Sequence, residues 1–220
     1  MEAIKSSTLD FLNKLKINNN RDWFTANKPL YYEAKDNFES FVQEVINEII
    51  NFEPVMKGLE VKSCVYRINR DIRFSKDKSP YKTYFGAFIV RGGKKNGDKF
   101  SGYYIHIEPG HSIIAGGAYM PPTPWLAAIR EKIDEEPERI AGIITSKDFI
   151  KYFRTIDGDK LKKAPKGYPS DHRNIELLKH KSFLIMNEVK DEFVLSGKYF
   201  DHVINVSKAM KPFNDFLNDY

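Results

Sequence analysis

The sequence has very little cysteine, because Cys64 is the only one among 220 residues. One thiol cannot close an intramolecular disulfide and suggests no structural zinc site, so we expect Cys64 to be a small buried residue. No run approaches the roughly 18 apolar residues of a membrane-spanning helix, and the first residues lack the pattern of a signal peptide. We therefore expect a soluble, cytoplasmic protein with no membrane partner.

Several familiar motifs are absent as well. The sequence contains no phosphate-binding glycine loop of the Walker type, no dinucleotide fingerprint and no Gly-x-Ser-x-Gly. Common nucleotide hydrolases and serine hydrolases are therefore disfavoured, and we predict no cofactor and no metal. Internal repeats and linkers are also missing, which predicts a single domain over residues 1–220.

The first fifty residues have the apolar spacing of helices. Ser6 or Ser7 is a candidate N-cap for a first helix, which residues 18–20, all asparagine, then end. A short second helix begins at Arg21 and is interrupted near Pro29. The next segment places apolar side chains three and four residues apart, as in a long amphipathic helix. These side chains are Phe38, Phe41, Val42, Val45, Ile46, Ile49 and Ile50.

The middle of the sequence changes to a period of two, which is typical of strands. Strands are predicted over residues 65–74, 83–90, 102–108 and 112–119, with a further one over 183–189. Helices resume at Thr123, a candidate cap, with a break near Pro137, and a closing helix spans residues 200–217. Residues 157–173 are rich in Lys, Gly and Pro and predict an exposed loop. The fold class is therefore α+β, with a central antiparallel sheet of about four or five strands and helices before, between and after them.

The positive charge is concentrated in two segments. The formal net charge is only +5. Residues 61–99, however, carry 11 basic and 3 acidic side chains, a net charge of +8, and residues 160–181 carry 7 and 2, a net charge of +5. Such patches raise the local concentration of anionic partners such as phosphates, carboxylates or nucleic acid, without choosing among them.

The densest chemistry lies between Arg67 and Lys82. Three arginines occur within seven residues, and the guanidinium fork is well suited to binding an oxyanion. Alternation along a strand would place Arg67, Asp71 and Arg73 on one face, with the carboxylate between the two guanidinium groups. We therefore predict an anion-binding module centred on this segment, with the phosphate of a nucleotide or nucleic acid as the leading ligand. The predicted site residues are Arg67, Arg70, Asp71, Arg73, Asp77, Lys78, Tyr81 and Lys82.

The pattern Arg-x-x-Arg-Asp-x-Arg-Phe-x-x-Asp-Lys-x-x-Tyr, which matches this sequence from Arg67 to Tyr81, resembles the signature of the bacterial domain of unknown function 2461. Residues 19–28 and the glycine pair in residues 114–117 are similar to the same family, so the resemblance covers essentially the whole chain. It implies a cytosolic bacterial protein of about this length. The family has no established activity, cofactor or catalytic residues, so the resemblance implies no reaction.

Two alternatives to a binding module stay open at this point. In the first, the chain is an enzyme that acts on an anionic substrate, with Asp71, Asp77 or the pair His106 and Glu108 as acid or base. Tyr104, His106 and Glu108 share one face of a predicted strand. In the second, the arginines and aspartates form structural ion pairs without a ligand. The oligomeric state and the biological process cannot be predicted from the sequence.

Overall fold

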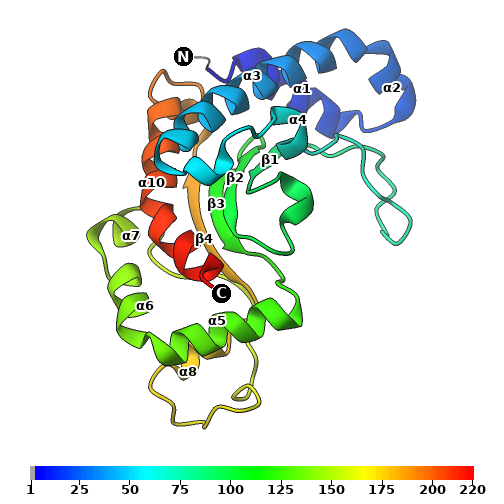
Figure 1. Ribbon diagram of the computed structural model, residues 1–220. Helices are drawn as coiled ribbons and strands as arrows, with labels where there is room; N and C mark the ends of the chain where they lie inside the picture. Colours follow the sequence, from blue (N-terminus) through cyan, green and yellow to red (C-terminus); the bar gives the residue numbers. More distant parts are fainter. Residues whose placement is uncertain (1–2) are drawn as a thin grey trace.

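The computed structural model describes residues 3–220. Its N-terminal part is helical, as predicted (Figure 1). It comprises α1 (Ser6–Ile17), α2 (Arg21–Ala26) and α3 (Lys28–Phe52). Asn20 is the N-cap of α2, since its side-chain oxygen accepts a hydrogen bond from the backbone N–H of Trp23 at 2.9 Å. Pro29 lies in the first turn of α3, where its missing N–H leaves no hydrogen bond unmade.

The predicted N-caps were wrong by about one residue. Ser6 is already the first residue of α1, and the Ser7 hydroxyl donates to Glu33 at 3.1 Å instead of capping. Thr123 is likewise the first residue of the helix that it was expected to cap. The N-cap positions are instead Lys5, which has extended backbone, and Pro122, and neither side chain makes a capping hydrogen bond.

The sheet has four antiparallel strands in sequence order, so four of the predicted strands are confirmed. They are β1 (Phe85–Ile89), β2 (Gly102–Ile107), β3 (Ser112–Ala118) and β4 (Phe183–Val189). Helices fill the long connection between β3 and β4, with the predicted break at Pro137: α5 (Thr123–Glu135), α6 (Pro137–Ile144), α7 (Lys147–Tyr152) and α8 (Ile175–Leu178). The closing helix is α10 (Tyr199–Asn218). Short helical turns complete the fold: η1 (Pro54–Met56), α4 (Val61–Cys64), η2 (Lys94–Asn96) and α9 (Asp191–Val194).

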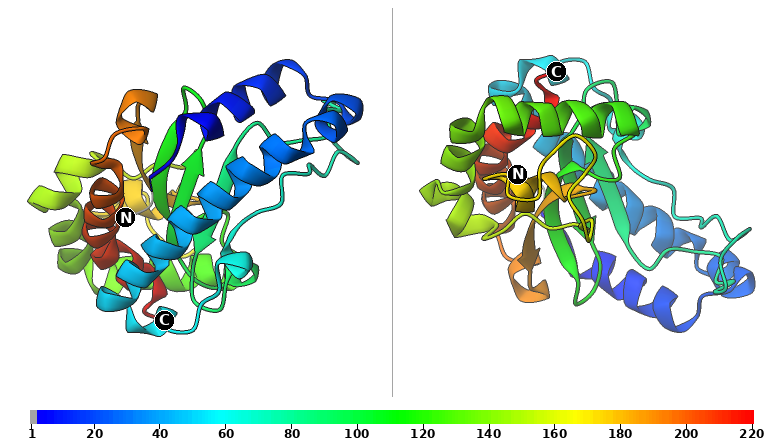
Figure 2. Two further views of the ribbon diagram at one scale, coloured as in Figure 1. Left: turned by 90° about the horizontal axis from the view of Figure 1, so that it is seen from above. Right: turned by 90° about the horizontal axis from the view of Figure 1, so that it is seen from below.

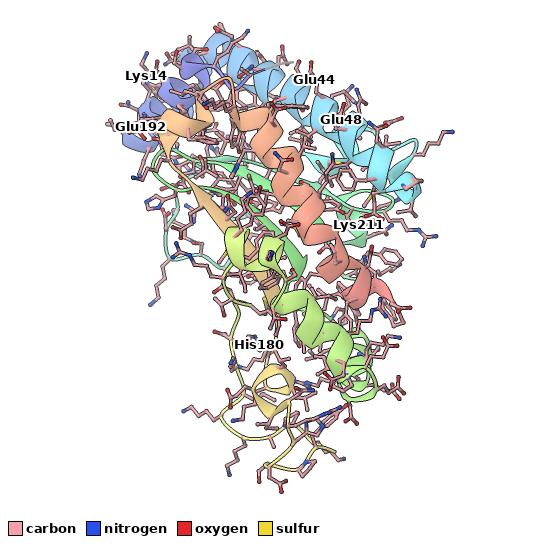
Figure 3. The ribbon with its side chains drawn as sticks, turned by 90° about the vertical axis from the view of Figure 1, so that its left-hand side faces the viewer. Lys14, Glu44, Glu48, His180, Glu192 and Lys211 are labelled. Atoms are coloured by element: carbon pink, nitrogen blue, oxygen red, sulfur yellow. The ribbon has the colours of Figure 1, made fainter. Side chains whose placement is uncertain are left out.

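One face of the sheet carries the core, because α3 and α10 pack against it (Figure 1 and Figure 2). Tyr103, Ile105 and Ile107 of β2 point to this side and are buried. Figure 3 labels Lys211 on α10, whose ammonium pairs with Glu53 after α3 at 3.2 Å. Alternation then leaves Tyr104, His106 and Glu108 on the opposite face, as predicted.

The predicted strand over residues 65–74 was wrong. Only two isolated bridges form, Val65 with Ala87 and Asn69 with Tyr81, and the chain then leaves the sheet edge. Residues 66–84 form an irregular projecting hairpin, which we call the arm; it lies beside α2 in Figure 1 and Figure 2. Alternation requires only an extended chain, whereas a strand also requires a continuous partner, and past Tyr66 the arm has only itself to pair with.

Candidate functional site

The base of the arm is fastened to the turn between α1 and α2. The Asn19 side chain makes both hydrogen bonds of a clasp, because its Nδ2 donates to the Tyr81 carbonyl at 2.9 Å and its Oδ1 accepts from the Tyr81 N–H at 3.1 Å. The Tyr81 ring stacks on Phe24 with 4.0 Å between centroids, and the residue is only 8% exposed. Tyr81, predicted as a site residue, therefore also has a packing role.

The tip of the arm is braced by Arg70 and Asp77. The Arg70 guanidinium pairs with the Asp77 carboxylate and donates to the Ser79 carbonyl at 3.3 Å. Asp77 also accepts from the backbone N–H and the hydroxyl of Ser79, at 2.9 and 2.6 Å. These donors, Ser79 first and Arg70 after it, hold the pKa of Asp77 far below its ordinary value. Asp77 is therefore an ionised brace for the loop.

Arg73 and Asp71 form a second, exposed pair. Arg73 donates from Nε and Nη2 to the two oxygens of Asp71 at 2.9 and 2.6 Å, and this bidentate contact lowers the pKa of Asp71. Lys78 donates to the Ile72 carbonyl at 3.0 Å. Arg70 and Arg73 thus pair with different carboxylates. The three arginines do not converge on one site, because Arg67 and Arg73 do not line the cleft that Arg70 lines.

Arg67 and Lys82 are neighbouring cations at the base of the arm, and neither forms a salt bridge among residues 3–220. Lys82 Nζ donates to the Arg67 carbonyl at 3.0 Å and lies over the rings of Tyr66 and Tyr84, 5.3 and 5.8 Å from their centroids. Burial, together with the nearby charge of Arg67, lowers the pKa of Lys82. Two positive charges therefore lie near each other without an ion pair among the described residues, and only Arg67 is close enough to a carboxylate, that of Asp71, to lower its pKa.

A cleft of about 660 Å³ opens between the arm and the end of α1, and we call it the arm cleft. Its lining residues are Lys16, Asn19, Arg70, Asp71, Asp77, Ser79, Tyr81, Lys82, Thr83 and Tyr84. Of the predicted site residues, Arg67, Arg73 and Lys78 do not line it. Lys16 and Asn19 were missed because they lie far away in sequence; the similarity of residues 19–28 to the family was the only signal in that region.

A chain of hydrogen bonds joins the arm cleft to the sheet. Thr83 Oγ1 donates to Glu108 Oε1 at 2.8 Å, and Glu108 Oε2 lies 3.1 Å from His106 Nε2. His106 Nδ1 lies 2.9 Å from the Tyr104 hydroxyl, and the imidazole packs on the Tyr84 ring. Neither His106 nor Glu108 lines the cleft, but both contact side chains that do.

The His106 imidazole is held neutral. Burial lowers its pKa from the ordinary 6.5, more strongly than Glu108 raises it. A carboxylate oxygen can only accept, so we assign the proton to Nε2, which leaves Nδ1 to accept from the Tyr104 hydroxyl. Burial also raises the pKa of Tyr104, so this hydroxyl keeps its proton near neutral pH.

We expect this neutral imidazole to make the protein less stable in mild acid. The unfolded chain binds a proton at a higher pH than folded His106 does, so the stabilisation is complete above about pH 6.5 and is lost as the pH falls toward the folded pKa. His180 and His202, whose pKa values burial also lowers, act in the same direction. In calorimetric melting between about pH 5.5 and 7.5, His106→Gln should show a shallower fall of Tm than the wild type. An unchanged slope would contradict this assignment.

The second basic segment has structural contacts of its own. Lys160 and Lys179 both pair with Glu176, at 3.4 and 2.8 Å. His180, labelled in Figure 3, is 2% exposed, and its carbonyl accepts from Arg130 at 3.1 Å. The exposed loop predicted here is confirmed, but part of its charge is already compensated within the fold.

Three further observations concern residues 3–220. Cys64 is buried, as predicted. This part of the chain contains no group of three or more His, Cys, Asp or Glu placed to bind a metal ion. Within the same residues, no helix combines the length and the apolar character that crossing a bilayer would demand.

Comparison with known proteins identifies the family. A search of curated proteins and a search of solved structures return no match. A family model described as "Conserved hypothetical protein (DUF2461)" matches residues 7–216, which is nearly the whole chain and includes the arm and the sheet. The chain therefore belongs to the DUF2461 family of conserved hypothetical proteins.

Proposed function

We propose that the protein is an anion-binding module and that the arm cleft binds the phosphate group of a nucleotide or nucleic acid. The observation that carries this proposal is Lys82, a partly buried lysine of the cleft lining that forms no salt bridge among residues 3–220 and has a second cation, Arg67, near it just outside the lining. Like charges near each other repel, and partial burial of Lys82 weakens the screening by water. A bound anion relieves both penalties.

The groups around Lys82 suit a phosphate. Its ammonium has three N–H donors, one of which donates to the Arg67 carbonyl, so two remain for a ligand. Lys16 adds another lysine ammonium to the lining. The carboxylates of Asp71 and Asp77, which also line the cleft, are each compensated by an arginine of the arm. The remaining positive charge therefore belongs to lysines that can receive a ligand.

Titration calorimetry with inorganic pyrophosphate tests this proposal. Lys82→Gln should weaken binding about tenfold or more, because a hydrogen bond to a charged group contributes about 1.5–3 kcal/mol. Arg67→Gln should weaken it through the missing charge. The matched control is Lys147→Gln, which removes the same charge from exposed Lys147 on α7, on the side of the molecule away from the arm (Figure 1). Equal affinities in all four proteins would refute the cleft as an anion site.

The hydrogen-bonded chain from Thr83 through Glu108 to His106 favours a second candidate, an enzyme acting on the same anionic group. Asp71 and Asp77 are poor acids for this purpose, because their pKa values are lowered and they hold no proton near neutral pH. Glu108 and His106 would have to move the proton. The two candidates are separated by whether the wild-type protein turns over a phosphate ester or only binds it.

A further inference from the structure

A large aromatic ring stands in solvent at the tip of the arm. Phe74 is 95% exposed, more than any other large hydrophobic residue among residues 3–220. Burial of a phenylalanine ring stabilises a folded protein. A ring that is almost fully exposed contributes little to folding, so folding does not explain its presence here. Its removal would leave the core untouched.

The ring is presented on a braced loop that carries positive charge. The Arg73 guanidinium lies 5.9 Å from the centre of the Phe74 ring, and Lys76 and Lys78 are exposed on the same tip. The pair Arg70–Asp77 and the bond from Lys78 to the Ile72 carbonyl hold the tip in shape. The ring is therefore preorganised for contact with a partner, so little ordering cost remains on binding.

We propose that Phe74 stacks on an unpaired base of a single-stranded nucleic acid whose phosphates bind along the arm and in the arm cleft. This inference rests on the proposed function and names its ligand class. Binding of single strands without sequence preference combines a basic track for the backbone with aromatic rings for the bases. The arm carries both elements. Its cations extend from the tip to Lys82, and the aromatic ring of Phe74 lies beside Arg73 at the tip.

Two arguments favour a single-stranded nucleic acid over a duplex and over an anionic membrane. A base in a duplex is already stacked on its neighbours, whereas a single strand offers a free face to the exposed ring without that unstacking cost. An anionic membrane would need a larger apolar surface, because the strength of interfacial binding scales with the apolar area that is buried. The tip offers a single exposed ring, since the neighbouring Ile72 is half-buried.

The test measures fluorescence anisotropy of a labelled oligothymidylate of roughly 15 nucleotides at several salt concentrations. Phe74→Leu should weaken binding about tenfold without changing the salt slope, because the ring carries no charge. Phe74→Trp should preserve the affinity, since it keeps an aromatic face. Lys82→Gln should instead flatten the plot of log K against log salt by about 0.7 for each phosphate that the variant no longer binds. Because Phe74 touches no core, these Phe74 variants should melt at the wild-type temperature.

The outcomes separate this inference from the proposed function. Binding of pyrophosphate but not of the oligonucleotide overturns the inference and leaves the anion site standing. Equal oligonucleotide affinity of wild type and Phe74→Leu also overturns it. If Phe74→Leu weakens binding and Lys82→Gln does not, the stacking role holds and the arm cleft is the wrong phosphate site. Cosedimentation of both the wild type and Phe74→Leu with phosphatidylserine vesicles, without oligonucleotide binding, would overturn the inference and favour a membrane surface as the anionic partner.

Discussion

Gly117→Ala is expected to destabilise the fold by about 4 kcal/mol or more, because it combines backbone strain with a steric overlap. Gly117 in β3 has a φ of +109°, in the region that side chains rarely adopt. A Cβ atom there would overlap the carbonyl oxygen of Phe183 in β4, which is backbone and cannot rotate away. The added methyl group must therefore push β3 and β4 apart.

Urea unfolding followed by circular dichroism measures this effect. Gly142→Ala in α6 is the matched control, because nothing lies within 4 Å of a Cβ built at Gly142. Alanine also has the higher helix propensity, so this control should be as stable as the wild type or slightly more so. A stable, wild-type-like Gly117→Ala would mean that β3 and β4 do not approach each other at this point.

Tyr81→Ala is expected to lower the free energy of unfolding by about 3 kcal/mol, as removal of a buried aromatic ring does. The ring fills the space against Phe24, and the Asn19 clasp uses only the backbone of Tyr81. The substitution therefore leaves the clasp in place but creates a cavity beneath the arm. Chemical unfolding monitored by tryptophan fluorescence reports the loss, because Trp23 lies next to Phe24 on α2.

Tyr81→Phe separates packing from ligand binding. The Tyr81 hydroxyl has no hydrogen-bond partner among residues 3–220, so its removal should change the stability by less than about 0.5 kcal/mol. Pyrophosphate affinity should also stay within about twofold of wild type. A Tyr81→Phe protein that folds normally but no longer binds the anion would show that the hydroxyl is a ligand group.

The longer helices and four strands were predictable because their periodicity reflects burial on one side. In α3, the predicted residues Phe38, Phe41 and Val42 are buried, since the helix packs against α1, β1 and α10. In β2, alternation correctly assigned Tyr103 to the core and Tyr104 to the opposite face. The same rule failed over residues 65–74 because Ile68 is buried whereas Phe74 is almost fully exposed. There the alternation has no sheet behind it.

The candidate site was predictable in composition but not in arrangement. The concentration of charge directed attention to residues 67–82, which include much of the lining of the arm cleft. Which arginine meets which carboxylate could not be predicted, because Arg70 turns to Asp77 seven residues away and Arg73 to Asp71 only two away. Lys16 joins the cleft only through the docking of the arm on the end of α1.

The sequence by itself determined the α+β class, the four strands and the segment in which positive charge gathers, since these depend on composition and on spacing along the chain. Only the tertiary structure decided that Arg67 and Lys82 form no salt bridge among residues 3–220 and that the Phe74 ring is exposed to water. It also decided that the space beside Gly117 is filled by β4 of the same chain. These facts depend on which distant groups meet, and local periodicity carries no information about such meetings.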